Sequence, residues 1–399
     1  MRQASTTSAR GFTFIELMVS LALGMLVVGA AVKLFSQGVD ATWVVSQRSE
    51  MQQDLRSVQG MLTKDISLAG AGMPAGQGIA LPSGGVSPIY GCDQTGTAAG
   101  CPPNGAVNYP CAAGGGCIPT LYGIIPGFTL GITPPGSATK SDLITATYTD
   151  SVFALNCYQV SITKNPTTVT FTAPATPVPA GWIPTCVPPP GLAGPQAIND
   201  PAVGLTPGDL ILFQGKVGAN TSYAIGEVTN VVGAKPTYTV SFAAGDPLKM
   251  NQSGAANDLS FFAPSPAAPN TIIANRIFVI TYYLQVLPDP LGVGAGTPRL
   301  MRQVSGHTAV PVAENVINTQ YTYDTYAADG TLLNETGDGG ASLGVSLNLI
   351  RKINITHLTM RSQLAGTRSA LMSTSGFQGY DLQTSISARN LNYQNRYTF

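Results

Sequence analysis

A continuous apolar run lies near the start of the chain, from Phe12 to Val32, and its only charged residue is Glu16. As an α-helix, at about 1.5 Å per residue, this run can cross the roughly 30 Å hydrocarbon core of a bilayer. Residues 1–11 are polar, and their basic residues Arg2 and Arg10 favour retention of this end in the cytoplasm. The pattern predicts a short leader over 1–11 and a membrane-spanning helix over 12–32.

After Lys33 the helical pattern becomes one-sided. Apolar residues recur mostly every three or four positions, at Phe35, Val39, Trp43, Met51, Leu55, Val58, Leu62 and Ile66. Gln, Ser, Arg, Asp and Lys separate them, which is typical of an amphipathic helix. The segment Gly70–Pro74 combines glycine and proline stop signals. We therefore expect one helix that continues over 33–70, with its stripe facing either a partner or the core of its own domain.

The remainder, 71–399, reads as a β-rich domain. Residues 71–140 are rich in Gly, Pro, Ser and Cys, which is typical of a loop region. Strand-like runs follow at Asp142–Tyr148, Val169–Thr172, Asp209–Phe213, Tyr223–Val232, Tyr238–Phe242, Arg276–Val286, Arg299–Val304, Val316–Asp324 and Leu347–Met360. No helical pattern separates these runs, so antiparallel sheets and an α+β fold are expected. Gly/Pro-rich segments flank 209–242, which we interpret as an inserted strand cluster.

Composition places this domain outside the cytoplasm. Charged residues make up 10% of the 399 residues, against about 25% in ordinary soluble domains, and Lys+Arg and Asp+Glu balance at 20 each. The cysteines are Cys92, Cys101, Cys111, Cys117, Cys157 and Cys186. None of them forms a C-x-x-C pair, so disulfides are favoured over a metal or redox centre. The simplest pairing joins neighbours along the chain, although six cysteines permit about 15 pairings.

Glu16 is the unusual residue of the apolar run, because an acid inside a membrane helix is costly and functional by default. Cleavage before Phe12 would create an α-amine four residues from this carboxylate. In a stack of identical stems, Glu16 of one subunit could pair with the amine of the next.

The decapeptide from Gly11 to Ser20, GFTFIELMVS, resembles the class III signal of type IV pilins and type II secretion pseudopilins. The resemblance implies that a prepilin peptidase cuts after Gly11 and methylates Phe12, and that Glu16 is the assembly carboxylate. It also implies that the amphipathic half of the helix packs on the protein's own β-sheet. Lys33 departs from the family, since major pilins often have a helix-kinking proline there.

A second resemblance, to PilW-type minor pilins, extends along the chain. It rests on Lys64–Gly70, Tyr282–Leu284, Arg299–Arg302, Val316–Asp324, Ile353–Ser362 and Ala388–Leu391. The resemblance implies a minor pilin that helps to initiate pilus assembly at or near the fibre tip. The alternatives are a tip-displayed adhesin, a DNA-binding subunit and a J-type pseudopilin of type II secretion.

The partners implied are prepilin peptidase, other minor and major pilins, the inner membrane and the pilus assembly machinery. Before assembly we expect a single-pass inner-membrane protein with a periplasmic domain, and afterwards a place in the pilus fibre at the cell surface. We expect no small-molecule substrate and no nucleic-acid partner. A basic excess after residue 339 (Arg351, Lys352, Arg361, Arg368, Arg389 and Arg396 against Asp381) is interpreted as scattered surface charge.

Other chemistry is sparse. Asp324, Asp329, Glu335 and Asp338 surround Gly330, and a loop rich in acids could hold calcium. Asp324, Asp329 and Asp338 are the candidate ligands, although solvated turn acids are the commoner explanation. The segment Gly340–Gly344 matches the hydrolase pattern G-x-S-x-G around Ser342, but it lacks the strand–turn–helix context and reads as a chance match. No other cofactor is expected, and we do not expect an enzyme.

Overall fold

The computed structural model describes residues 11–74, 78–82, 84, 88, 120–134, 139–162, 167–175, 195–217, 220–262, 272–287, 296–327, 329–362 and 379–394. The chain forms two compact units. One contains Met1–Gln53 with Ser362–Gln378, and the other contains Asp54–Arg361 with Gly379–Phe399. The fold is α+β, as the sequence predicts: a long helix precedes a domain of antiparallel sheets.

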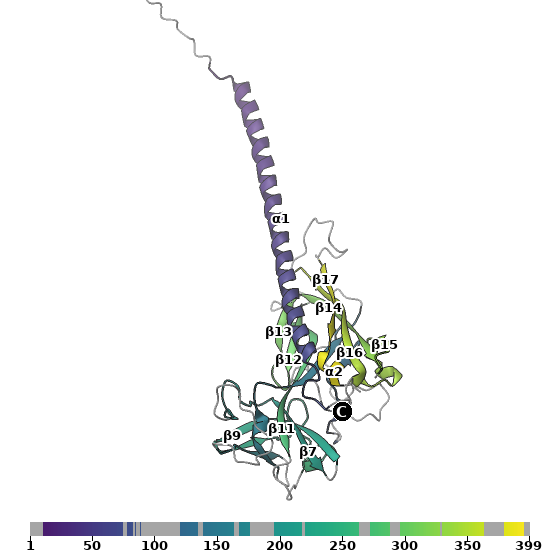
Figure 1. Ribbon diagram of the computed structural model, residues 1–399. Helices are drawn as coiled ribbons and strands as arrows, with labels where there is room; N and C mark the ends of the chain where they lie inside the picture. The colour runs from purple at the N-terminus through teal and green to yellow at the C-terminus, as the bar shows by residue number, and fades with distance from the viewer. Residues whose placement is uncertain are drawn as a thin grey trace, which may run out of the picture. The chain divides into compact units, whose positions relative to one another are not determined.

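Helix α1 runs from Phe14 to Leu68 over 55 residues, and Figure 1 draws it as one continuous helix. Its two segments behave differently. Side chains from Phe14 to Phe35 are exposed, whereas Leu55, Val58, Leu62 and Ile66 are at most 2% exposed. These four residues, each three or four positions from the next, form one face that packs into the largest hydrophobic core. The C-terminal half of the predicted stripe, from Leu55 to Ile66, therefore packs in the core of the domain, as the pilin resemblance implies.

This face of α1 packs against a seven-stranded antiparallel sheet. Its strands are β3 (Ile124–Gly127), β4 (Leu143–Thr149), β7 (Leu210–Val217), β8 (Asn220–Glu227), β11 (Ile273–Leu287), β12 (Thr297–Val304) and β13 (Val310–Glu314). The main path is β13-β12-β11-β4-β3, and β7 pairs with both β11 and β8. Strand β11 is the longest strand and is hydrogen-bonded in turn to β7, β4 and β12. It therefore links this sheet along its length.

Two further sheets have four strands each. One has the order β15-β14-β16-β17, from Leu332–Thr336, Val316–Tyr326, Ile350–Arg361 and Gly379–Ser387, and its inner residues share the core of α1. Its strands and the short helix α2 (Arg389–Gln394) can be followed in green to yellow in Figure 1. The other has the order β5-β6-β10-β9, from Gln159–Ile162, Thr168–Thr172, Thr237–Ser241 and Asn230–Ala234. A two-stranded sheet pairs β1 (Ile79–Ala80) with β2 (Thr120–Leu121).

Short 3₁₀-helices complete the elements: η1 (Leu155–Cys157), η2 (Leu259–Phe262), η3 (Ala341–Leu343) and η4 (Leu347–Leu349). The predicted insertion at 209–242 is divided between two sheets, because β7 and β8 extend the seven-stranded sheet while β9 and β10 join β5 and β6. Residues 209–242 therefore contribute two strands to each of these sheets, and the inserted strand cluster stays a prediction.

Candidate functional site

The N-terminal site is built around the first turn of α1. Thr13 precedes the helix, and its hydroxyl accepts the backbone N–H of Glu16 at 3.4 Å. In return the Glu16 carboxylate accepts the backbone N–H and the hydroxyl of Thr13, both at 3.0 Å. This reciprocal arrangement is a capping box, which satisfies two otherwise free donors at a helix N-terminus. The spacing Thr-x-x-Glu at 13–16 is its sequence signal, which the expectations above leave out.

The capping box gives Glu16 a position before any partner is present. Gly11 and Phe12 are exposed on the N-terminal side of the box, and a Cβ on Gly11 would meet nothing within 4 Å. The Gly11–Phe12 bond is thus sterically open to a protease. Glu16 holds its carboxylate within one helical turn of that bond, where a new amine would form.

The N-terminal part of α1, from Phe14 to Phe35, is largely apolar and exposed. Helix α1 is long and apolar enough to cross a membrane, and its most apolar stretch is not buried. Within the described ranges it is the only such helix. Because large exposed apolar surfaces mark contacts with lipid or with other proteins, the segment fits a membrane anchor.

A buried polar cluster around Asp65 holds the C-terminal end of α1 to the seven-stranded sheet. Asp65 is 1% exposed and accepts hydrogen bonds from Tyr148 on β4, Tyr282 on β11 and Arg302 on β12. The distances are 3.1 Å from Tyr148, 2.6 Å from Tyr282 and 2.9 Å from Arg302 Nε, with a further bond of 3.3 Å from Arg302 Nη2. We call this group the Asp65 joint. Burial, reinforced by the Asp65 charge, raises the pKa of Tyr148 and Tyr282, so both hydroxyls stay protonated and donate.

The last turn of α1 is also capped from the C-terminal part of the chain. Asn390 on α2 donates its side-chain amide to the carbonyls of Ser67 at 3.2 Å and Leu68 at 3.3 Å. The next residue, Leu391, contacts Gly70, whose φ is +80° and whose added Cβ would lie 2.5 Å from Leu391 Cδ2. The glycine stop predicted at Gly70 therefore serves both the left-handed turn and this close approach.

These contacts join four of the segments on which the second resemblance rests, and that resemblance stays a prediction. Its separate segments supply Asp65, Tyr282, Arg302 and Asn390, which the structure gathers around the last turns of α1. The predicted apolar stripe does not include Asp65. Its position three residues after Leu62 and seven after Val58 nevertheless places it on the buried face, and an acid on an apolar stripe was the available signal.

Of the six cysteines, the structure describes only Cys157. Cys157 is buried and disulfide-bonded. Cys92, Cys101, Cys111, Cys117 and Cys186 lie outside the described residues. The neighbour-to-neighbour pairing, including 157 with 186, therefore stays a prediction.

The three candidate calcium ligands are not brought together. Asp324 accepts from Lys352 at 3.0 Å and Asn354 at 2.8 Å, while Asp329 accepts the N–H of Thr331. Asp338 accepts the N–H groups of Gly340 and Ser342, and these bonds, with others from Thr336, outweigh burial and lower its pKa to about 2. Among the residues that the structure describes, no group of three His, Cys, Asp or Glu side chains could hold a metal. Asp329 and Asp338 hold turns, whereas Asp324 on β14 binds Lys352 and Asn354 of β16, and the calcium prediction gains no support.

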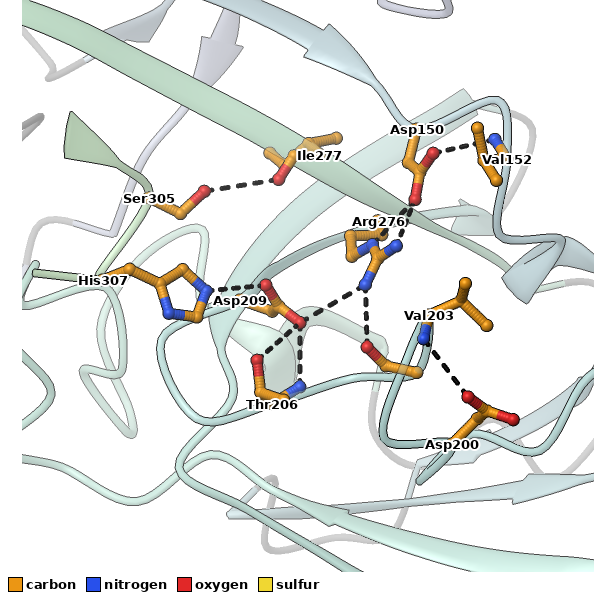
Figure 2. Close-up of polar contacts among 11 residues, drawn as sticks. Asp150, Val152, Asp200, Val203, Thr206, Asp209, Arg276, Ile277, Ser305 and His307 are labelled. Atoms are coloured by element: carbon orange, nitrogen blue, oxygen red, sulfur yellow. Dashed lines mark hydrogen bonds and ion pairs between the residues drawn. The ribbon is translucent and has the colours of Figure 1, made fainter. Parts of the chain in front are cut away.

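The histidines sit in separate polar clusters. His307 contacts Asp209 at 2.9 Å, and Asp209 lies 3.6 Å from Arg276, which also binds Asp150. Figure 2 shows Arg276 between the two aspartates, with His307 on the far side of Asp209. His357 contacts Asp381 at 2.9 Å on β17. Ser342, from the hydrolase-like pattern, lies in η3 after a glycine turn, without the strand–turn–helix context that a nucleophile needs.

Comparison with known proteins bears on the N-terminal site. Residues 6–32 match the family model described as the prokaryotic N-terminal methylation motif. No curated protein and no solved structure matches the chain. The matched residues include Gly11, Phe12, Glu16 and the apolar run, so the match supports a type IV pilin-like protein that prepilin peptidase processes and that assembles with other pilins.

Proposed function

We propose that this chain is a minor pilin of the PilW type, a structural subunit that helps to initiate a type IV pilus and sits at or near the fibre tip. The single observation that carries the proposal is the coincidence of the methylation motif with an exposed apolar stem whose first turn fixes Glu16. Gly11 would be the cleavage glycine, Phe12 the methylated residue and Glu16 the assembly carboxylate.

The β domain would be displayed outside the inner membrane, in the periplasm first and at the cell surface after assembly. The disulfide at Cys157 supports this placement, because disulfides persist in oxidising compartments. The buried face of α1 and the Asp65 joint would transmit load from the stem to this domain, since both tie the helix end to the seven-stranded sheet.

Two substitutions separate the charge of Glu16 from its capping role. Glu16→Gln keeps an acceptor for the Thr13 N–H, because Gln also serves in capping boxes, but it removes the charge. Thr13→Val removes the hydroxyl of the box and keeps the charge. If pairing with a neighbouring amine is the function, Glu16→Gln is processed but poorly incorporated into pili, whereas Thr13→Val is incorporated normally.

The measurement is the amount of subunit in sheared pili relative to processed subunit in the membrane. Asp40→Asn, on an exposed part of the same helix, is the matched control for loss of a carboxylate. Normal incorporation of Glu16→Gln together with failure of Thr13→Val would contradict the charge-pairing role and favour a capping role.

Deletion of the chain tests the minor-pilin role against the alternatives. Loss of all pili supports an initiator. Normal pili with lost attachment or lost DNA uptake would support the tip-displayed adhesin or DNA-binding subunit, and a secretion defect would support the J-type pseudopilin.

A further inference from the structure

A turn after β10, residues 246–251, is held from both sides by buried carboxylates. Asp246 accepts the backbone N–H groups of Met250 at 2.6 Å and Asn251 at 3.0 Å. Glu227, the last residue of β8, accepts the N–H of Leu248 at 2.9 Å. The Asn251 side chain accepts the N–H of Glu227 and donates to its carbonyl. The turn is therefore tied to the end of β8 by backbone and carboxylate bonds.

Both carboxyl groups are deep in the protein. Glu227 is 0% exposed and Asp246 is 4% exposed. Two buried carboxylates that hold the same turn cannot both be charged without a large cost. Asp246 accepts two backbone N–H groups, whereas the Glu227 carboxylate accepts one.

The two oxygens of Glu227 differ in their surroundings, since only one of them accepts a backbone N–H from the described residues. Glu227 Oε1 is buried and has no donor among the described residues, and it faces the backbone of Gly306, where an added Cβ would lie 2.1 Å away. A protonated Glu227 can donate to Asp246. Burial, followed by this hydrogen bond, raises the pKa of Glu227.

The charged groups around Glu227 come from three elements. Asp246 and Lys249 lie in the turn itself, Asp209 precedes β7, and His307 follows Gly306 between β12 and β13. Asp209 already contacts His307 and Arg276 (Figure 2). Arg276 of that cluster is thus engaged by Asp150 and Asp209.

We propose that Glu227 and Asp246 form a proton-dependent latch that closes the 246–251 turn over the apolar side chains of Leu248 and Met250. Those two side chains are each 1% exposed and pack with Leu210, Leu212 and Ile225. When Glu227 loses its proton, two like charges face each other and the turn opens, exposing Leu248 and Met250.

The direction of the pH effect follows from linkage. The closed turn holds a proton that the open, solvated turn releases, because the ordinary pKa of a glutamate is 4.5 and that of closed Glu227 is raised. The latch is at full strength below pH 4.5 and weakens as the pH rises toward the pKa of closed Glu227. One proton released on opening makes the opening equilibrium about tenfold more favourable for each pH unit in this interval.

Hydrogen exchange of the full chain in detergent micelles tests the latch. The readout is the protection of the amides in 246–251, corrected for intrinsic exchange, at several pH values from 5 upward. We expect protection in the wild type to fall about tenfold per pH unit. In Glu227→Gln, whose amide can donate to Asp246 without titrating, protection should not depend on pH.

Two control variants localise the effect. Glu314→Gln alters an exposed carboxylate on β13, and His307→Gln removes the nearest histidine. Both should keep the wild-type slope. A wild-type slope in Glu227→Gln, or a flat profile in His307→Gln, would overturn the proposal.

A measurement on the wild type covers the case in which Glu227→Gln does not fold. The infrared spectrum at neutral pH should contain the stretching band of a protonated carboxylic acid, and this band should disappear as the pH is raised. Absence of that band at neutral pH would also overturn the proposal.

Discussion

Replacement of Asp65 by Ala tests how the helix is held to the sheet. The change removes one buried carboxylate and leaves the Tyr148 and Tyr282 hydroxyls and the Arg302 guanidinium without their shared acceptor. Loss of one partner from a buried ion pair costs about 3–5 kcal/mol. Arg302 keeps some access to water, with 24% of its side chain exposed, so we expect the lower end, about 3 kcal/mol of unfolding free energy.

The assay is urea unfolding of the full chain in micelles, followed by far-UV circular dichroism. Asp381→Ala is the matched control, because Asp381 also accepts hydrogen bonds from three side chains, those of His357, Thr359 and Gln383, but its side chain is 33% exposed. An exposed pair of this kind contributes less than about 1 kcal/mol. Equal losses in Asp65→Ala and Asp381→Ala would refute the reasoning that burial makes the joint strong.

Three further changes address the end of the helix and the domain's response to pH. Asn390→Ala removes the side-chain donor to the Ser67 and Leu68 carbonyls and should cost about 1 kcal/mol by the same assay, whereas an unchanged midpoint would contradict the cap. Gly70→Ala forces a Cβ into Leu391 at a φ of +80° and should cost about 1–3 kcal/mol, while a neutral result would mean that the turn relaxes freely. Burial raises the pKa of Asp142 from 3.8 to about 6 against the N–H bonds from Thr129 and Tyr321, so the folded state holds the extra proton. Stability from this group is full below pH 3.8 and is lost as the pH rises to about 6, and Asp142→Asn should remove that part of the pH dependence of unfolding.

The elements with strong apolar patterns were predictable. The stripe on α1 and the runs that became β4, β6, β10, β11, β12 and β14 carry enough alternating or continuous apolar residues to specify a face. The expected strand at Leu347–Met360 begins three residues later, because Ser346 caps a 3₁₀ turn at Leu347–Leu349. The run Tyr223–Val232 is divided between two strands, since β8 ends at Glu227 and β9 begins at Asn230 in another sheet.

The edge strands were missed for a physical reason. Strands β13, β15 and β17 each pair on one side, and their residues are mostly exposed or half-buried. Pro311 in β13 and the polar residues of β17 weaken the usual strand signal, yet both are acceptable at an edge. Local patterns therefore carry little information about these strands, and pairing with a long neighbour decides their structure.

The N-terminal motif could be predicted from the sequence, whereas the Asp65 joint could not. Gly11, Phe12 and Glu16 are adjacent in sequence, so a local motif reveals them. The Asp65 joint combines residues from α1, β4, β11 and β12, with separations of up to 237 positions, and only the folded sheet brings them together. The acids at 324–338 led to a calcium prediction because a loop whose carboxylates hold turns has the same residue types as a loop that binds calcium. Asp329 and Asp338 hold turns.

Mass spectrometry of the mature N-terminus tests the central claim most directly. The chain would be produced together with a prepilin peptidase, and its N-terminal peptide would be analysed beside that of Gly11→Val. The account predicts a wild-type peptide that begins at Phe12 and carries one additional methyl group on its amine, and an uncut leader in Gly11→Val. A wild-type chain that keeps residues 1–11, or that is cut elsewhere, would contradict a pilin-like subunit built on Phe12 and Glu16.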